Sequence, residues 1–323
     1  MTPIHPDTPS DARRPARHAP AAAGIVLVFA LVTAFAALAA GCSTTDTARP
    51  KAGTYVPASG AASGYGAVPA AASPAAAQAA RASSTAFGAQ VDAATAAFAS
   101  SVGRLQTDVA AGDTTTARSD ELAAQAAFDA FRVLEAGNAV NGATLDERST
   151  DVGAQQSFGG LHAVEQDLWA SGPLAADVSA LAGQAPVAQF LLGRERLGPE
   201  AIGVVAVDQL NWVADDALPV GQEQYSHLGL VDVAATEQAA HRTFADILPL
   251  ARLVVPALAS TVDGQFTVLD AEVAGLGDPT TVPDSSVDPG ARLALSRQLD
   301  ATATTLARLA AALTPYGTRG APS

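Results

Sequence analysis

The segment PAAAQAARASSTAFGAQVDAATAAFASSVGRLQTDVAAG, residues 74–112, decides the fold class of this chain. Ser73 and Pro74 form a typical N-cap and first-turn pair. Alanine fills much of the segment and favours helix, because it loses no rotamer entropy there. Apolar side chains spaced three, four or seven residues apart lie on one face of a helix. The segment therefore predicts one long amphipathic helix, whose larger apolar residues are Phe87, Val91, Phe98, Val102, Leu105 and Val109.

The rest of the chain continues this helical pattern. Asp113 can cap a second helix, which is expected to run through Phe131 and Leu134 to about Gly137. No segment shows the sustained alternation that is typical of a strand. Hydrophobic residues make up 49% of the 323 residues, which is ample for a sizeable core. We predict an all-α protein built from antiparallel helical bundles. Further helices are expected near 174–192, 199–217, 227–262 (with bends at Pro249 and Pro256), 264–274 and 290–313.

The N-terminus carries the pattern of an export signal. Arg13, Arg14 and Arg17 precede an uncharged apolar run over residues 20–40, and Leu-Ala-Ala-Gly comes directly before Cys42. A basic region, an apolar region and a small-residue cleavage site define a secretory signal. Because a cysteine follows the small residues, residues 1–42 resemble a bacterial lipoprotein signal, in which Cys42 would carry the lipid. A simple membrane anchor is the alternative interpretation of the apolar run.

The region after Cys42 is typical of a flexible tether. Residues 43–73 are rich in Ser, Thr, Gly, Pro and Ala and have no apolar periodicity. The folded helical domain is therefore expected to span residues 74–323. Cys42 is the only cysteine in the chain, so no disulfide is expected. These patterns predict an exported protein that is anchored to the outer face of the cell membrane as a lipoprotein.

The charge of the chain excludes one class of partner. The formal net charge at neutral pH is −14, whereas binding to nucleic acid requires a basic surface for the phosphates. We therefore expect no nucleic-acid partner. The acidity suits a cation ligand, and it is equally explained by a solvated acidic surface.

One histidine and one glutamate lie three residues apart in an otherwise apolar stretch. On a helix, His162 and Glu165 would lie on neighbouring positions of one face, so their side chains can converge. An imidazole nitrogen and a carboxylate oxygen are both good ligands for iron, zinc or manganese. An acid/base pair or an intrahelical hydrogen bond explains the spacing without a metal. The stretch has no H-E-x-x-H pattern, so it does not match the usual zinc metalloprotease motif.

Three segments of the chain resemble one known family. FGGLHAVEQDLW, residues 158–169, is similar to the G-x-H-x-x-E signature of the imelysin family, and its flanking aromatic and Leu-Trp fit the iron-uptake branch, the EfeO/EfeM type. FRVLE, residues 131–135, and QYSHLGLVD, residues 224–232, are similar to two further segments of that family. The resemblance covers about residues 74–320, so a short form without the cupredoxin domain of longer members is expected.

The resemblance implies a fold and a set of ligands. It implies two related four-helix bundles and a metal site around the G-x-H-x-x-E motif, with carboxylates from neighbouring helices. His162 and Glu165 match the motif itself. Glu135 matches the glutamate of the earlier helix and is the third expected ligand. Asp146 lies in a loop that resembles the family's acidic region after that helix, and it is the fourth.

The second half of the chain departs from the family pattern. His227 and Asp232 match its later segment and suggest a second-half site. However, Leu228 and Gly229 replace the expected Thr-Asp, and Trp212 falls near the position of an expected glutamate. A hydrogen-bonded histidine at a helix start is the alternative interpretation of His227.

The resemblance, the signal and the acidity together suggest a non-enzymatic function. We expect a lipid-anchored extracytoplasmic iron-binding protein that delivers iron to a membrane permease, with a haem peroxidase as a further partner of the same system. Carboxylates would favour Fe(III), and the histidine would favour Fe(II) or Zn(II). Two alternatives stay open: an imelysin-type metallopeptidase, and a structural surface lipoprotein whose metal site is degenerate.

Overall fold

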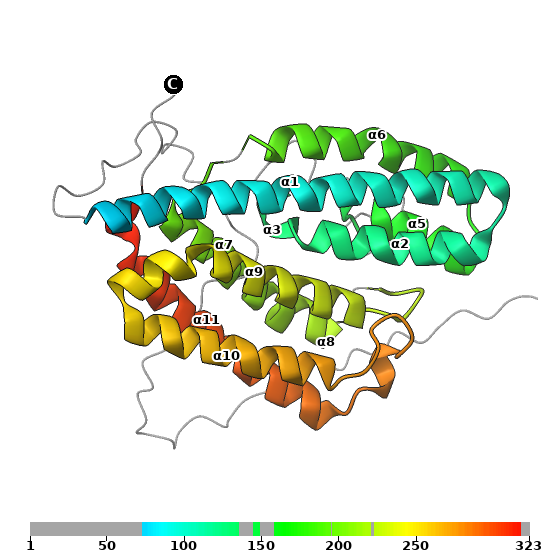
Figure 1. Ribbon diagram of the computed structural model, residues 1–323. Coiled ribbons are helices and arrows are strands. Elements are labelled where there is room, and N and C mark those ends of the chain that lie inside the picture. The colour runs from blue at the N-terminus through cyan, green and yellow to red at the C-terminus, as the bar shows by residue number, and fades with distance from the viewer. Residues whose placement is uncertain (1–72, 136–144, 149–157, 195, 221–222, 318–323) are drawn as a thin grey trace, which may run out of the picture. The chain divides into compact units, whose positions relative to one another are not determined.

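The computed structural model describes residues 73–135, 145–148, 158–194, 196–220 and 223–317. Within these ranges every regular element is a helix, which confirms the predicted all-α fold (Figure 1). None of the described helices is both long and apolar enough to cross a bilayer. The predicted signal peptide, the lipidation site Cys42 and nearly all of the predicted tether lie outside the described residues.

The first helix, α1 (Pro74–Ala111), has the ends that its sequence predicts. The Ser73 hydroxyl accepts a hydrogen bond from the backbone N–H of Ala76 at 3.2 Å. Gly112 ends the helix in the left-handed conformation with φ of 74°, which glycine adopts without steric cost. The Asp113 carboxylate then caps α2 (Thr114–Asp129) by accepting from the backbone N–H of Thr116.

The second helix is shorter than predicted. It ends at Asp129, a turn follows at Phe131, and the separate short helix α3 (Arg132–Glu135) begins after it. The Phe131 ring is buried and lies 5.7 Å from the Phe98 ring and 5.3 Å from the Phe128 ring. This aromatic packing against α1 and α2 favours the turn. Tertiary contacts of this kind cannot be inferred from the spacing of apolar residues in the sequence.

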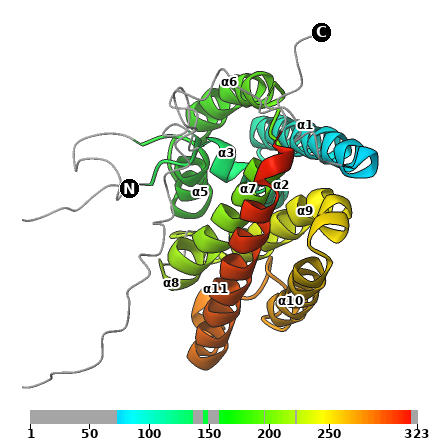
Figure 2. The ribbon, with the colours of Figure 1, turned by 90° about the vertical axis from the view of Figure 1, so that its left-hand side faces the viewer.

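Eight of the helices in the described residues form two groups of four. In the first group, α1 and α2 pack together with α5 (Leu161–Ala170) and α6 (Leu174–Leu192). In the second group, α7 (Pro199–Trp212) and α9 (Leu230–Val254) pack with α10 (Pro256–Ala274) and α11 (Pro289–Ala312). Contacts of α9 with α1 and α2 join the groups, and Figures 1 and 2 show this arrangement from two directions.

The predicted helix over 227–262 has different ends in the structure. Helix α9 begins at Leu230 and stops at Val254, and α10 begins at Pro256 instead of near residue 264. Val255 has ψ of 61°, outside the helical range, because the residue before a proline is pushed away from the helical conformation. Pro249 lies inside α9 without ending it.

The segment between α7 and α9 brings polar groups towards the first group of helices. After α7 the chain forms a π-helical turn, η1 (Val213–Ala217), and the short helix α8 (Leu218–Val220). Residues 223–229 then lead into α9 without regular structure. The remaining short elements are the 3-10 turns η2 (Asp284–Ser286) and η3 (Thr314–Tyr316).

Candidate metal centre

Helix α5 places two candidate ligands on one buried face. Gly160 precedes the helix with φ of 81° and ψ of −156°, a conformation that a residue with a side chain rarely adopts. His162 and Glu165 follow in the first turns of α5, and both side chains are buried. The predicted helical spacing of these two residues is therefore present, and it directs both side chains inward.

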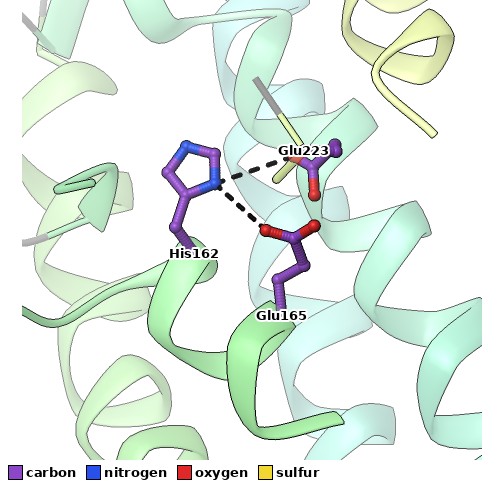
Figure 3. A group of neighbouring side chains, drawn as sticks. All are labelled: His162, Glu165 and Glu223. Carbon is purple, nitrogen blue, oxygen red and sulfur yellow. Dashed lines mark ion pairs between the residues drawn. The ribbon is translucent and has the colours of Figure 1, made fainter. Parts of the chain in front are cut away.

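A third side chain completes a buried group that the sequence did not indicate. The Nδ1 atom of His162 lies 3.7 Å from Oε2 of Glu165 and 3.8 Å from Oε1 of Glu223 (Figure 3). One ligand atom from each of the three residues lies within 4.8 Å of the others. We call His162, Glu165 and Glu223 the trio. Glu223 comes from the segment between α8 and α9, far along the chain from α5.

The dimensions of the trio suit a transition-metal ion. Zinc and similar ions bind nitrogen and oxygen at about 2.0–2.2 Å, so neighbouring ligand atoms around them lie about 3.0–3.5 Å apart. The two distances from His162 Nδ1, 3.7 and 3.8 Å, exceed this by only a few tenths of an ångström. The third pair, between the two glutamates, lies within 4.8 Å, so the three atoms are near the spacing that one ion requires.

Glu165 uses its two oxygens differently. Its Oε1 atom accepts hydrogen bonds from the backbone N–H groups of Tyr225 at 2.9 Å and Ser226 at 2.8 Å. Its Oε2 atom faces His162 and has no hydrogen-bond partner among the described residues. Burial raises the pKa of Glu165, but His162 and the two backbone N–H groups outweigh this effect, so the pKa is lowered. Glu165 is thus held ionised and oriented.

The other nitrogen of His162 faces a second carboxylate. Its Nε2 atom lies 3.3 Å from Oδ1 of Asp146. Burial lowers the pKa of His162, but the neighbouring carboxylates of Asp146 and Glu165 outweigh this and raise the pKa to about 9. In metal sites a carboxylate in this position orients the ring and fixes which nitrogen carries the proton. Asp146 therefore fits an orienting role better than the ligand role that the sequence suggested.

Arg132 holds Asp146 in place. Its guanidinium forms ion pairs with Asp146 and with Asp129, the latter at 2.6 Å. The same group lies 4.0 Å from the centre of the Trp212 ring and 4.8 Å from that of Phe128. Burial raises the pKa of Asp146, but Arg132 outweighs this and lowers it. The turn that ends α2 places Arg132 between these groups.

The site contains more buried acid than base. Burial, with added repulsion from neighbouring carboxylates, raises the pKa of Glu121, Glu223 and Asp232 well above the ordinary range. Fully ionised, the surrounding carboxylates would carry −6 against +2 from Arg132 and protonated His162, a net −4. Buried charge of this size must be neutralised by protons or by a bound cation. The six carboxylates are Glu121, Asp129, Asp146, Glu165, Glu223 and Asp232.

Three of the predicted site residues lie apart from the trio. Glu135 is buried, its carboxylate has no hydrogen-bond partner among the described residues, and burial raises its pKa to about 7. It does not join the trio. Asp232 is buried in the first turn of α9, where Asp129 and Arg132 perturb its pKa. His227 is exposed in the turn before α9.

His227 and Asp232 differ in their access to solvent, because His227 is exposed and Asp232 is buried, and the second-half site stays a prediction. His227 adopts a left-handed conformation with φ of 60°. This turn leaves the imidazole at the surface, whereas α9 directs Asp232 inward. Asp232 lies among the acidic groups around Arg132, close to Asp129.

Three buried acids of the site, Glu121, Asp129 and Glu223, were missed by the sequence interpretation. Glu223 lies in an irregular segment and follows no periodicity, so only the folded chain reveals it. Glu121 could have been found from the sequence, because Glu121, Gln125 and Asp129 recur four residues apart on the buried face of α2. The Gln125 amide donates to Asp129 Oδ1 at 3.1 Å. A row of polar residues on a core-facing helix stripe indicates a buried polar site.

No known family model matches the chain, and no curated protein matches it.

Proposed function

We propose that the trio binds one transition-metal ion and that the protein is a metal-binding protein. The observation that carries this proposal is the convergence of one imidazole and two carboxylates in a buried, acid-rich setting. Oε2 of Glu165 and both carboxylate oxygens of Glu223 have no hydrogen-bond partner among the described residues. Buried polar atoms of native proteins are normally satisfied, and a cation would satisfy these.

The ligand set supports a particular range of metals. One nitrogen and two carboxylate oxygens suit Fe(II), Fe(III), Mn(II) and Zn(II) better than the soft Cu(I), which prefers sulfur. The choice of iron within this range follows the resemblance of residues 158–169 to the iron-uptake branch of the imelysin family. We propose iron as the transported ion and a membrane iron permease as its recipient, with a haem peroxidase as a further component.

The proposed location follows from the N-terminal sequence. The basic, apolar and small-residue regions before Cys42 support export and lipid anchoring at the outer face of the membrane. A metal-binding domain at that location would capture ions before they reach a permease. Mass spectrometry of the purified chain tests this part directly, because lipidation removes residues 1–41 and adds acyl chains to Cys42.

A metal titration of the full chain in mild detergent tests the binding site. We expect about one equivalent of ferrous iron under anaerobic conditions, and loss of this binding in the double variant His162→Ala/Glu165→Ala. His241→Ala/Asp270→Asn is the matched control, because it removes another histidine and carboxylate whose side chains lie 3.2 Å apart. Full stoichiometry in the first double variant would exclude the trio as the site.

A further inference from the structure

A cavity of about 770 Å³ lies beside the trio. It is formed by the η1–α8 region, residues 223–227, the η2 turn and the start of α11. His227 and Leu293, which line the cavity, are exposed, so the cavity opens to solvent. Its volume lies within the range of pockets that admit small ligands. The trio itself is buried, so a metal ion needs such an opening to reach it.

Glu223 belongs to both the cavity and the trio. It lines the cavity wall, and its Oε1 atom lies 3.8 Å from His162 Nδ1. Its side chain is only 2% exposed, and both of its carboxylate oxygens have no hydrogen-bond partner among the described residues. Glu223 is therefore the residue that the cavity wall and the candidate metal centre share.

His227 is fixed at the outer part of this cavity. Its backbone N–H donates to the carbonyl of Glu223 at 3.1 Å, and its carbonyl accepts from the backbone N–H of Asp284 at 3.0 Å. The Asp284 carboxylate packs against Gly229, where a Cβ atom would lie 2.8 Å from Oδ2. These contacts connect His227 to Glu223 through one turn of backbone and hold the strained left-handed conformation of His227.

The side chains along the cavity offer ligand atoms to a cation. Glu223 and Asp284 are acidic, and Arg292 is the only basic side chain apart from His227 among the lining residues. The Arg292 guanidinium donates to the carbonyl of Leu218 at 2.7 Å and to the carbonyl of Asp284. Its N–H groups are thus directed to the backbone, and the net negative charge of the chain adds to the attraction of a positive ion.

We propose that this cavity is the route by which the metal ion enters and leaves the trio, with His227 as a transient ligand near the mouth and Glu223 as the first ligand of the site. The proposal rests on metal binding by the trio. An imidazole at the mouth and a carboxylate at the inner end are both suitable ligands for the ions considered above. The ion would pass from one to the other along the turn that connects them.

Partial filling of the cavity tests the route. Ser296 lies on α11 and lines the cavity without belonging to the trio. In Ser296→Trp we expect the release of ferrous iron to an excess of chromogenic chelator to slow about tenfold, the factor that an added barrier of about 1.4 kcal/mol imposes. The dissociation constant should stay unchanged, because a narrowed route slows entry and release equally.

The structure offers a matched control for this variant. A second cavity of about 590 Å³ is lined by residues of α2, including Ser119, and by residues of α9. It does not include the trio. Ser119→Trp should therefore release iron at the wild-type rate. Release should be independent of chelator concentration in every variant, which shows that the ion leaves before it is captured.

A smaller change tests the role of His227 without filling the cavity. His227→Ala alters an exposed side chain, and we expect release about threefold slower with an unchanged dissociation constant, a barrier increase of about 0.7 kcal/mol. His241→Ala should release iron at the wild-type rate. Wild-type release rates in both Ser296→Trp and His227→Ala, with one iron bound, would overturn the route. Absence of iron from the wild-type chain would instead overturn the proposed function.

Discussion

Two regions of the molecule pair a histidine with carboxylates, and they differ in their access to water. At the trio, His162 is 3% exposed and faces Asp146, Glu165 and Glu223. On α9, His241 is 32% exposed, its Nδ1 atom lies 3.2 Å from Asp270, and its ring stacks on Phe266. Water can screen the charges of the second pair and complete its hydrogen bonds. The buried charges of the first region must instead be neutralised by protons, by Arg132 or by a bound cation. Residue types alone therefore do not define the candidate metal centre; burial does.

The largest expected effect concerns the buried arginine that belongs to the first region. In Arg132→Met, the carboxylates of Asp129 and Asp146 lose their cationic partner, and removing one partner of a buried ion pair costs about 3–5 kcal/mol of unfolding free energy. The exposed pair of Arg252 with Asp263 provides the comparison. Arg252→Met should cost at most about 1 kcal/mol. Chemical denaturation of the metal-free protein measures both, and equal losses would contradict the difference between buried and exposed pairs.

The next effect concerns the orientation of His162. Asp146→Asn keeps the shape of the side chain but removes the charge beside Nε2, so we expect metal affinity to fall about 10–100-fold, as for other outer-shell partners. Asp270→Asn changes the corresponding carboxylate of the α9 region and should leave affinity unchanged. Competition with a chelator of known affinity measures this. Complete loss of binding in Asp146→Asn would instead indicate that Asp146 is itself a ligand.

A third effect concerns Glu237, which is buried beside Asp270. Burial and the nearby Asp270 raise the pKa of Glu237 from about 4.5 to about 8. Its protonated form is favoured by folding, so this stabilisation is complete below pH 4.5 and is lost as the pH rises through 8. Glu237→Gln cannot ionise, so it should lose about 4 kcal/mol less stability than the wild type between pH 5 and pH 9, at about 1.4 kcal/mol for each unit of the pKa shift. Thermal unfolding across this range measures the difference, and parallel curves would show that Glu237 does not titrate there.

The smallest effect is expected from His241→Ala. The half-exposed ring loses its stacking on Phe266, a contact worth about 0.5–1.5 kcal/mol, while metal stoichiometry and affinity should not change. Isothermal titration with ferrous iron measures both binding quantities. A weaker affinity in this variant would show that the α9 region takes part in binding despite its access to water.

Much of the fold follows from local patterns, whereas the interruptions of the helices do not. The apolar spacing in α1 and the caps at Ser73 and Asp113 are local and are present in the structure. The turn at Phe131 depends on aromatic packing against α1 and α2. The bend predicted at Pro256 is a complete break in the structure, because a proline disfavours helix at the residue before it.

The candidate site also has a part that local sequence predicts and a part that only the folded chain reveals. His162 and Glu165 share one helix, so their convergence follows from spacing alone. Glu223 meets them only through tertiary structure, because it precedes α9 in a segment without periodicity. Asp146 was expected as a ligand, but its role depends on Arg132. The buried position of Arg132 cannot be inferred from the residues beside it in the sequence.

The trio draws its members from both groups of helices. His162 and Glu165 belong to α5 in the first group, and Glu223 lies on the segment that connects α7 and α9 in the second. The first half of the chain alone therefore lacks one of the three ligands, and the second half lacks two. On the proposed function, the ion would find all three ligands only after both halves have folded together, so occupancy of the site would report on complete folding.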